Sequence, residues 1–129
     1  MGNKENYQAV QAAIVGGDYE GIRSYVADEF VLYEPEALPY GGVYVGAQGF
    51  IDLARKIREL FEVDVVSSSL TEVGEELLVA EFVFGFTSLR TRERVETYVV
   101  DLFRFDQDGK LIRADIVYYL DPAKLAEIA

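Results

Sequence analysis

Asp101 places a carboxyl group in the middle of an apolar strand pattern. The run VETYVVDLFRF, residues 95–105, alternates so that Asp101 shares one face with Val99 and Phe103. An ionised carboxylate is costly among such side chains, and protonation is its usual escape. The group is therefore either paired, with backbone amides or a nearby Tyr or Arg, or held neutral for a chemical purpose.

Glu34 ends a second apolar strand pattern, FVLYE. Its face also carries Phe30 and Leu32, and the plain alternative to a functional role is a solvated strand end before Pro35. Two inward-facing carboxyl groups in an apolar interior, Glu34 and Asp101, indicate proton-transfer chemistry.

The composition narrows the class of partner. Of 129 residues, 50% are hydrophobic and 13% aromatic, which is enough for a sizeable core and a lined cavity. Twelve basic against 23 acidic residues give a net charge of −11, which argues against binding nucleic acid or an anionic membrane surface. A neutral, apolar small molecule fits this charge better.

Several chemistries lack their usual residues. The chain has no cysteine and no histidine, so we expect no disulfide, no metal site and no cofactor. The first residues, MGNKEN, lack the apolar stretch of a signal peptide, and no apolar run approaches the length of a membrane span. These features predict a cytoplasmic protein.

The elements that position the acids are helices in the first half and strands in the second. Helices are predicted over residues 6–15, 18–27 and 47–61, with a turn-rich loop over 35–46. Strands are predicted over 29–34, 62–71, 76–89, 92–105 and 110–120, and a short terminal helix after Asp121 and Pro122. This order predicts a single α+β domain over residues 1–129, with helices on one face of a curved, mostly antiparallel sheet.

The two faces of this sheet differ in the predicted pattern. The inner face carries Leu78, Ala80, Phe82, Phe84 and Phe86 on one strand, and Ile112, Ala114, Ile116, Tyr118 and Leu120 on the last. The outer face also carries apolar side chains, which a monomer would expose: Leu77, Val79, Val83, Tyr98, Val100, Leu102, Val117 and Tyr119. An apolar patch of this size usually marks an interface, so we expect a homodimer through the outer face.

Four segments resemble a known superfamily. They are AAIVGGDYEGI at 12–22, VLYEP at 31–35, LPYGGVYVG at 38–46 and VVDLFRFDQDGKL at 99–111. Together with the element order, they resemble the nuclear transport factor 2-like cone, and the 38–46 loop is similar to that of its SnoaL-like branch. The segments at 12–22, 31–35 and 99–111 resemble bacterial ketosteroid isomerases. The resemblance implies a cystatin-like cone with three N-terminal helices packed in a strongly curved sheet.

The resemblance also implies roles for the two acids. Asp101 falls on a protonated aspartic acid that donates a hydrogen bond to the substrate oxyanion, and Glu34 falls on the general base, an aspartate in the family. Val10 takes the place of the family's oxyanion-hole tyrosine and cannot donate, although Tyr7 lies one turn earlier on the same helix face. The valine argues against steroid isomerisation itself and leaves open another enolisation, an intramolecular aldol cyclisation, a dehydration or an epoxide opening.

We expect further residues to line the interior that holds the acids. Tyr7 and Tyr40 have hydroxyl groups that are candidate donors; the plain alternative for each is an amphipathic tyrosine with its tip in water. The remaining candidates for contact with an apolar substrate are Val10, Phe82, Phe84, Phe103, Ile116 and Tyr118, which ordinary core packing would also explain.

Two hypotheses follow for the function. One is a cofactor-free isomerase, cyclase or lyase acting on an apolar carbonyl compound; the other is a non-catalytic module of the same fold that binds an apolar ligand or supports a dimer. Catalysis requires both carboxyl groups to reach one cavity. It also predicts that Asp101 is buried with a raised pKa, whereas Glu34 is better wetted and mostly ionised.

Overall fold

Alternating apolar side chains make the sheet bury one of its faces. In β4 (Leu77–Ser88), Leu78, Ala80 and Phe82 are buried, whereas Glu81 between them is exposed. The same alternation holds in β5 (Arg94–Phe105), where Val99 and Asp101 point inward. The inner face predicted for these two strands is therefore confirmed.

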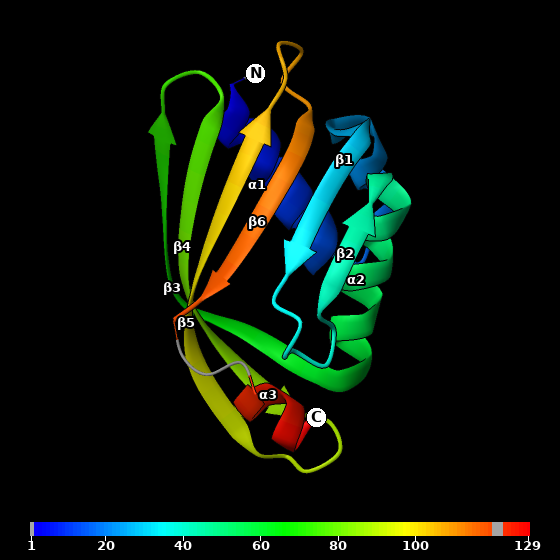
Figure 1. The fold of residues 1–129 in the computed structure, drawn as a ribbon, viewed down its shortest axis with the longest axis vertical. Helices are drawn as coiled ribbons and strands as arrows, with labels where there is room; N and C mark the ends of the chain where they lie inside the picture. The colour runs from blue at the N-terminus through cyan, green and yellow to red at the C-terminus, as the bar shows by residue number, and fades with distance from the viewer. Residues whose placement is uncertain (1, 120–122) are drawn as a thin grey trace.

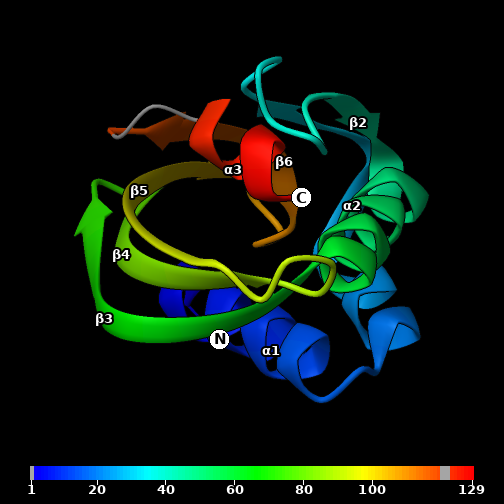
Figure 2. The same cartoon turned by 90° about the horizontal axis from the view of Figure 1, so that it is seen from below.

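The computed structural model describes residues 2–119 and 123–129. Six strands form one curved sheet in the order β2-β1-β6-β5-β4-β3 (Figures 1 and 2). The four other strands are β1 (Val26–Glu34), β2 (Gly42–Val45), β3 (Phe61–Val73) and β6 (Leu111–Tyr118). All neighbouring strands are antiparallel except β1 and β6, which are parallel.

Helices cover the concave side. They are α1 (Asn3–Val15), the 3-10 helix η1 (Tyr19–Tyr25) and α2 (Gly46–Leu60). Figure 1 shows α1 behind the sheet and α2 beside β1 and β2. The three predicted helices and the α+β cone are thus confirmed. No helix within the described ranges is long and apolar enough to cross a membrane.

Two local predictions between residues 18 and 46 are wrong. Asp18 does cap the second helix, since its side chain accepts from the backbone N–H of Gly21 at 3.2 Å, but that helix ends at Tyr25. Val26 already belongs to β1 because it pairs with Leu111 of β6. The predicted loop contains the strand β2, in which Tyr44 pairs with Leu32.

A register shift alters the inner face of β6. Arg104 of β5 pairs with Arg113, whereas the next residue, Phe105, pairs with Leu111. Leu111 is therefore fully buried, and Ile112, which was predicted to point inward, is not part of the core cluster. A bulge cannot be read from alternation alone. The predicted inward position of Leu120 and the cap at Asp121 and Pro122 lie outside the described residues.

A short C-terminal helix, α3 (Ala123–Ile128), confirms the last predicted element. Figure 1 places it at the end of the molecule opposite the N-terminus, beside the β4–β5 turn. Leu125 and Ile128 are buried in the main core cluster, and Arg90 of the turn donates to the carbonyl of Ala129 at 2.7 Å. This end of the cone is therefore covered by side chains.

Candidate active site

Sheet register brings the two acids to opposite sides of one residue. Asp101 of β5 pairs with Ile116 of β6. On the other side of β6, Tyr33 of β1 pairs with Asp115, so the next residue, Glu34, lies beside Ile116. Neighbouring strands are about 4.8 Å apart, which separates the backbones that carry the two acids by about 10 Å. The carboxyl groups thus flank a floor formed by Ile116.

Asp101 is a buried acid with an oxygen atom that has no hydrogen-bond partner among the described residues. The residue is only 8% exposed, and its buried Oδ1 accepts no hydrogen bond from any described residue. Burial raises the pKa of Asp101 to about 7, because desolvation disfavours the charged form. The sequence-based expectation of an inaccessible acid with a raised pKa is confirmed.

Glu34 departs from expectation. It is as buried as Asp101, at 8% exposed, and its Oε2 likewise has no partner among the described residues. Burial, followed by the negative charge of Asp101, raises the pKa of Glu34 well above its ordinary value. The prediction of a wetted Glu34 is therefore wrong, and the shift of its pKa is opposite to the one that would favour the ionised form. The alternation of side chains correctly predicted the face on which Glu34 lies, but not how deeply this end of β1 is buried.

Two tyrosine hydroxyl groups meet beside the acids. Tyr40, in the loop between β1 and β2, lies 2.5 Å from Tyr118 of β6, measured between the hydroxyl oxygens. The charges of Glu34 and Asp101 help to raise the pKa values of both phenols, although burial is the largest cause. The four polar groups therefore share one interior.

The loop that carries Tyr40 is tightly built. Tyr44 donates from its hydroxyl to the carbonyl of Tyr40 at 2.8 Å. A Cβ atom at Gly41 would lie 2.2 Å from the carbonyl oxygen of Pro35, so only glycine fits there. This packing fixes Tyr40, which is 1% exposed, against the sheet.

Helix α1 contributes the remaining candidates on the Asp101 side. Tyr7 is buried and packs on Phe103, with ring centroids 4.6 Å apart. Its hydroxyl accepts a hydrogen bond from Gln11, and its pKa is raised by burial and then by the charge of Asp101. Val10 is fully buried in the same cluster. Tyr7 therefore lies near Asp101, where the resemblance places the missing tyrosine.

The apolar candidates gather in the same core. Those buried in it, or partly buried against it, are Phe82, Phe84, Phe103, Ile116 and Tyr118. Sequence analysis did not single out Thr97, which is 3% exposed and whose hydroxyl has no partner among the described residues. The alternation of side chains places Thr97 on the same face as Asp101, so its inward position could have been predicted from the sequence.

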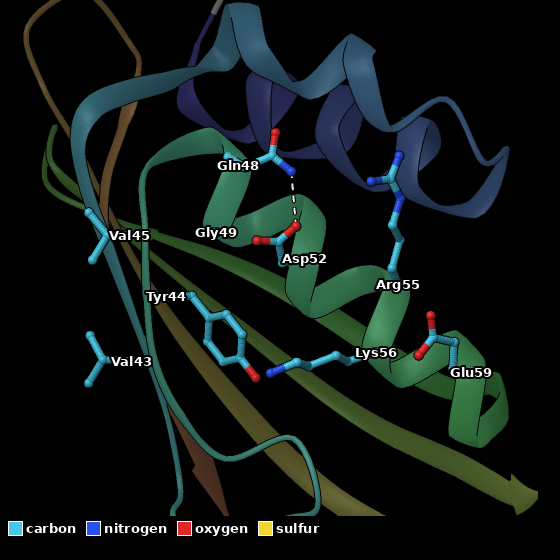
Figure 3. A pocket seen from close by; sticks show the side chains of 9 residues that line it. All are labelled: Val43, Tyr44, Val45, Gln48, Gly49, Asp52, Arg55, Lys56 and Glu59. Carbon is cyan, nitrogen blue, oxygen red and sulfur yellow. Dashed lines mark hydrogen bonds between the residues drawn. The ribbon is translucent and has the colours of Figure 1, made fainter.

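The surface hollows lie elsewhere. A groove of about 710 Å³ lies between β2 and α2 and is lined by Tyr44, Gln48, Asp52 and Lys56, among others (Figure 3). A second, of about 410 Å³, adjoins the β3–β4 turn. Neither is lined by an acid of the site. In the described part of the chain, no cluster of three or more acidic side chains is arranged to hold a metal ion.

Comparisons with known proteins agree with this architecture. The model of the SnoaL-like domain matches residues 7–114. An NTF2-like protein from Burkholderia xenovorans superimposes with a TM-score of 0.88 at 18% identity, covering 98% of this chain and 94% of that one. TerC, crystallised with polyporic acid, gives 0.81 at 22% identity, covering 98% and 96%. A candidate polyketide cyclase from Pseudomonas putida gives 0.81 at 16% identity, covering 100% and 99%. Among curated proteins, none matches this chain in sequence.

Proposed function

The chain belongs to the SnoaL-like domain family, and we propose that it is a small-molecule isomerase, cyclase or lyase that enolises an apolar carbonyl substrate without a cofactor. One observation carries this proposal: two buried carboxyl groups, Asp101 and Glu34, flank a single apolar floor, and Oδ1 of Asp101 and Oε2 of Glu34 have no hydrogen-bond partner among the described residues. Structural acids at such depth are normally paired, and unpaired ones with raised pKa values are typical of functional sites.

The proposed step is a proton transfer from carbon. Glu34, as the carboxylate, takes a proton from the carbon next to the substrate carbonyl. The electron pair of that C–H bond forms the enolate, and its negative oxygen accepts a hydrogen bond from protonated Asp101. Return of the proton to a different carbon, attack of the enolate on a second carbonyl, or loss of a leaving group then gives isomerisation, cyclisation or elimination.

Substrate binding supplies the charge distribution that this step needs. Burial raises the pKa of Asp101 to about 7, and burial, followed by the charge of Asp101, raises the pKa of Glu34. A substrate carbonyl facing Asp101 accepts a hydrogen bond only from the protonated acid and thus raises its pKa further. Loss of the Asp101 charge removes one cause of the raised pKa of Glu34. Substrate binding therefore favours a protonated Asp101 together with an ionised Glu34.

The test is proton exchange on an apolar ketone that enolises readily. In D2O, the protein should accelerate deuterium incorporation next to the carbonyl of 2-tetralone, as followed by proton NMR. Glu34→Gln should lower this rate by at least ~100-fold, the usual contribution of a general base. Asp101→Asn should lower it by only about tenfold, because the amide still donates a hydrogen bond.

The control is Glu62→Gln, which removes an exposed carboxylate on β3 that pairs with Arg92. This variant should exchange 2-tetralone at the wild-type rate. Equal rates for the wild type and Glu34→Gln, in proteins with equal melting temperatures, would refute the enzymatic proposal.

A second candidate function is an apolar-ligand-binding module of the same fold. The observation that favours it is Val10, which is fully buried and offers no donor where the resemblance expects a tyrosine hydroxyl. This function predicts that 2-tetralone binds in the interior without exchange above the solvent rate. Asp101→Asn would then change the dissociation constant alone.

A further inference from the structure

The burial of Glu34 depends on the loop that follows it. The β1–β2 loop, residues 35–41, leaves β1 directly after Glu34, and the chain returns in β2, where Gly42 pairs with Glu34. Within the loop, Leu38 and Tyr40 are buried, at 4% and 1% exposed. The charge of Glu34 helps to raise the pKa of Tyr40, after burial, which places the two side chains near each other. The inner side of the loop therefore shields Glu34 from water.

Three hydrogen bonds hold this loop in place. Two are internal: the N–H of Leu38 donates to the carbonyl of Pro35 at 3.1 Å, and the N–H of Gly41 donates to the carbonyl of Leu38 at 3.0 Å. The third comes from outside the loop, where the buried Tyr44 hydroxyl donates to the carbonyl of Tyr40 at 2.8 Å. A carbonyl oxygen can only accept, so the direction of this bond is fixed. Tyr44 thus fastens the loop to the sheet.

Tyr44 itself is held from two sides. In β2 it pairs with Leu32 of β1. On the other side, α2 approaches so closely that a Cβ atom at Gly49 would lie 2.9 Å from the backbone carbonyl carbon of Tyr44. Figure 3 shows Lys56 extending from α2 towards the Tyr44 ring, with its ammonium nitrogen 5.3 Å from the ring centroid. The ring is therefore a fixed anchor whose hydroxyl group reaches the loop.

We infer that Tyr44 is a positioning residue of the active site, which keeps the β1–β2 loop closed over Glu34 by holding the carbonyl of Tyr40. This inference rests on the proposed function, in which Glu34 is the general base. A carboxylate shielded from water is a stronger base than a hydrated one, because desolvation favours the protonated form. Without the Tyr44 hydroxyl, the loop would open more often, and Glu34 would be wetted and weakened as a base.

Loop closure also decides how Glu34 titrates. The titratable groups that face it among the described residues are Asp101 of β5, Tyr118 of β6 and Tyr40 of the loop. Burial is the largest cause of the raised pKa of Glu34, and the charge of Asp101 comes second. Opening of the loop removes part of the burial and leaves Asp101 in place. The pKa of Glu34 should then fall towards its ordinary value, and its ionised fraction at neutral pH should increase.

Two measurements on Tyr44→Phe test the inference without a substrate. The first is a pH titration of the Glu34 carboxyl carbon by 13C NMR, with the signal assigned from its absence in Glu34→Gln. At pH 7, the ratio of ionised to protonated Glu34 should be at least about tenfold higher in Tyr44→Phe than in the wild type. The second is hydrogen exchange of backbone amides. The N–H groups of Leu38 and Gly41 should exchange at least about tenfold faster, whereas that of Val99 in β5 should keep its wild-type rate.

Tyr33→Phe is the matched control, because it removes the hydroxyl of another tyrosine of the same hairpin. Tyr33 is 38% exposed and lies under the guanidinium of Arg113, which stacks on the ring and not on the hydroxyl. This variant should change neither the titration of Glu34 nor the exchange of the loop amides. In Tyr44→Phe, the acidic limb of the pH profile for 2-tetralone exchange should also move to lower pH, which a loss of stability alone does not produce.

A wild-type titration of Glu34 in Tyr44→Phe would overturn the inference, whatever the melting temperature of the variant. Equal acceleration of amide exchange in the loop and in β5 would also overturn it, because the Tyr44 hydroxyl would then support the whole fold and not the loop. Failure of the wild type to exchange 2-tetralone would refute the proposed function instead. The two substrate-free measurements would still decide whether Tyr44 holds the loop over Glu34.

Discussion

The two faces of the same sheet treat acidic residues in opposite ways. On the outer face, Asp64 lies 2.5 Å from Arg94, and Asp115 lies 2.8 Å from Arg113. These side chains are exposed or half-exposed, and the bond to Arg94 lowers the pKa of Asp64. On the inner face, Asp101 has no basic partner in the described part of the chain, and its pKa is raised.

This difference separates exposed, ion-paired carboxylates from a buried carboxyl group in which desolvation disfavours the charge. Exposed ion pairs are cheap to make and contribute little to stability. A buried, unpaired carboxyl lowers stability, and proteins keep such groups mainly where function requires them. Exposed acids in ion pairs and buried acids both occur on β5 and the strands around it. The contrast between them therefore depends on the face of the sheet and not on the strand.

The largest expected effect is a pH dependence of stability due to Asp101. Its folded-state pKa of about 7 exceeds the unfolded value of about 3.9. Between these values the folded protein holds more protons than the unfolded chain, so stability falls as pH rises from about 4 to about 7. The full loss is on the order of 4 kcal/mol. Urea unfolding gives the free energies of unfolding of the wild type and of Asp101→Asn at pH 4.5 and pH 8. The change in the difference between the two proteins from one pH to the other measures this loss.

The pH dependence of stability due to Asp64 should have the opposite sign, and Asp64→Asn tests it. The pKa of Asp64 is lowered in the folded state, so its contribution is present above the unfolded pKa and is lost as pH falls. Relative to this variant, the wild type should lose stability only on acidification. If Asp101→Asn and Asp64→Asn change the pH profile in the same direction, the proposed contrast between the two faces is wrong.

The next expected effect concerns assembly through the outer face. Val100 pairs with Glu81 on one side and Val117 on the other, and the nearby Tyr98 and Tyr119 rings are 5.1 Å apart. We expect a homodimer that covers this patch, because an apolar surface of this extent favours a partner. Val100→Lys should weaken it at least about tenfold, since the interface would bury an unpaired charge.

Sedimentation equilibrium at micromolar concentration measures the dimer. The control is Val43→Lys, which makes the same substitution at an exposed residue on the edge strand β2, which does not neighbour β5. A monomeric wild type would show that the outer face is simply a tolerated apolar surface. Equal weakening by both substitutions would locate the interface elsewhere.

The sequence was sufficient to predict the fold and the inner faces of β4 and β5, but not the bulge that removes Ile112 from the core or the contacts across the site. Period-two alternation placed Asp101 and Thr97 inward because strand side chains must alternate. It could not show the contact between Tyr40 and Tyr118, which joins residues 78 positions apart. Nor could it show the burial of Glu34, which depends on where the β1–β2 loop folds back. Long-range packing decides both features.

The smallest expected effect compares two buried hydroxyl groups on the neighbouring strands β4 and β5. Ser88 is fully buried, and its hydroxyl accepts from the backbone N–H groups of Arg90 and Thr91 at 3.2 and 3.1 Å. Thr97 is equally inaccessible but has no partner among the described residues.

Thr97→Val keeps the side-chain shape and removes the unpaired hydroxyl, so it should stabilise the protein by about 1 kcal/mol. Ser88→Ala should destabilise it by about 1–2 kcal/mol, because two amides lose their acceptor. Urea unfolding at pH 7 measures both changes. Destabilisation by Thr97→Val would mean that its hydroxyl is hydrogen-bonded in solution, and the inner face would then not be the unpaired environment that the two acids indicate.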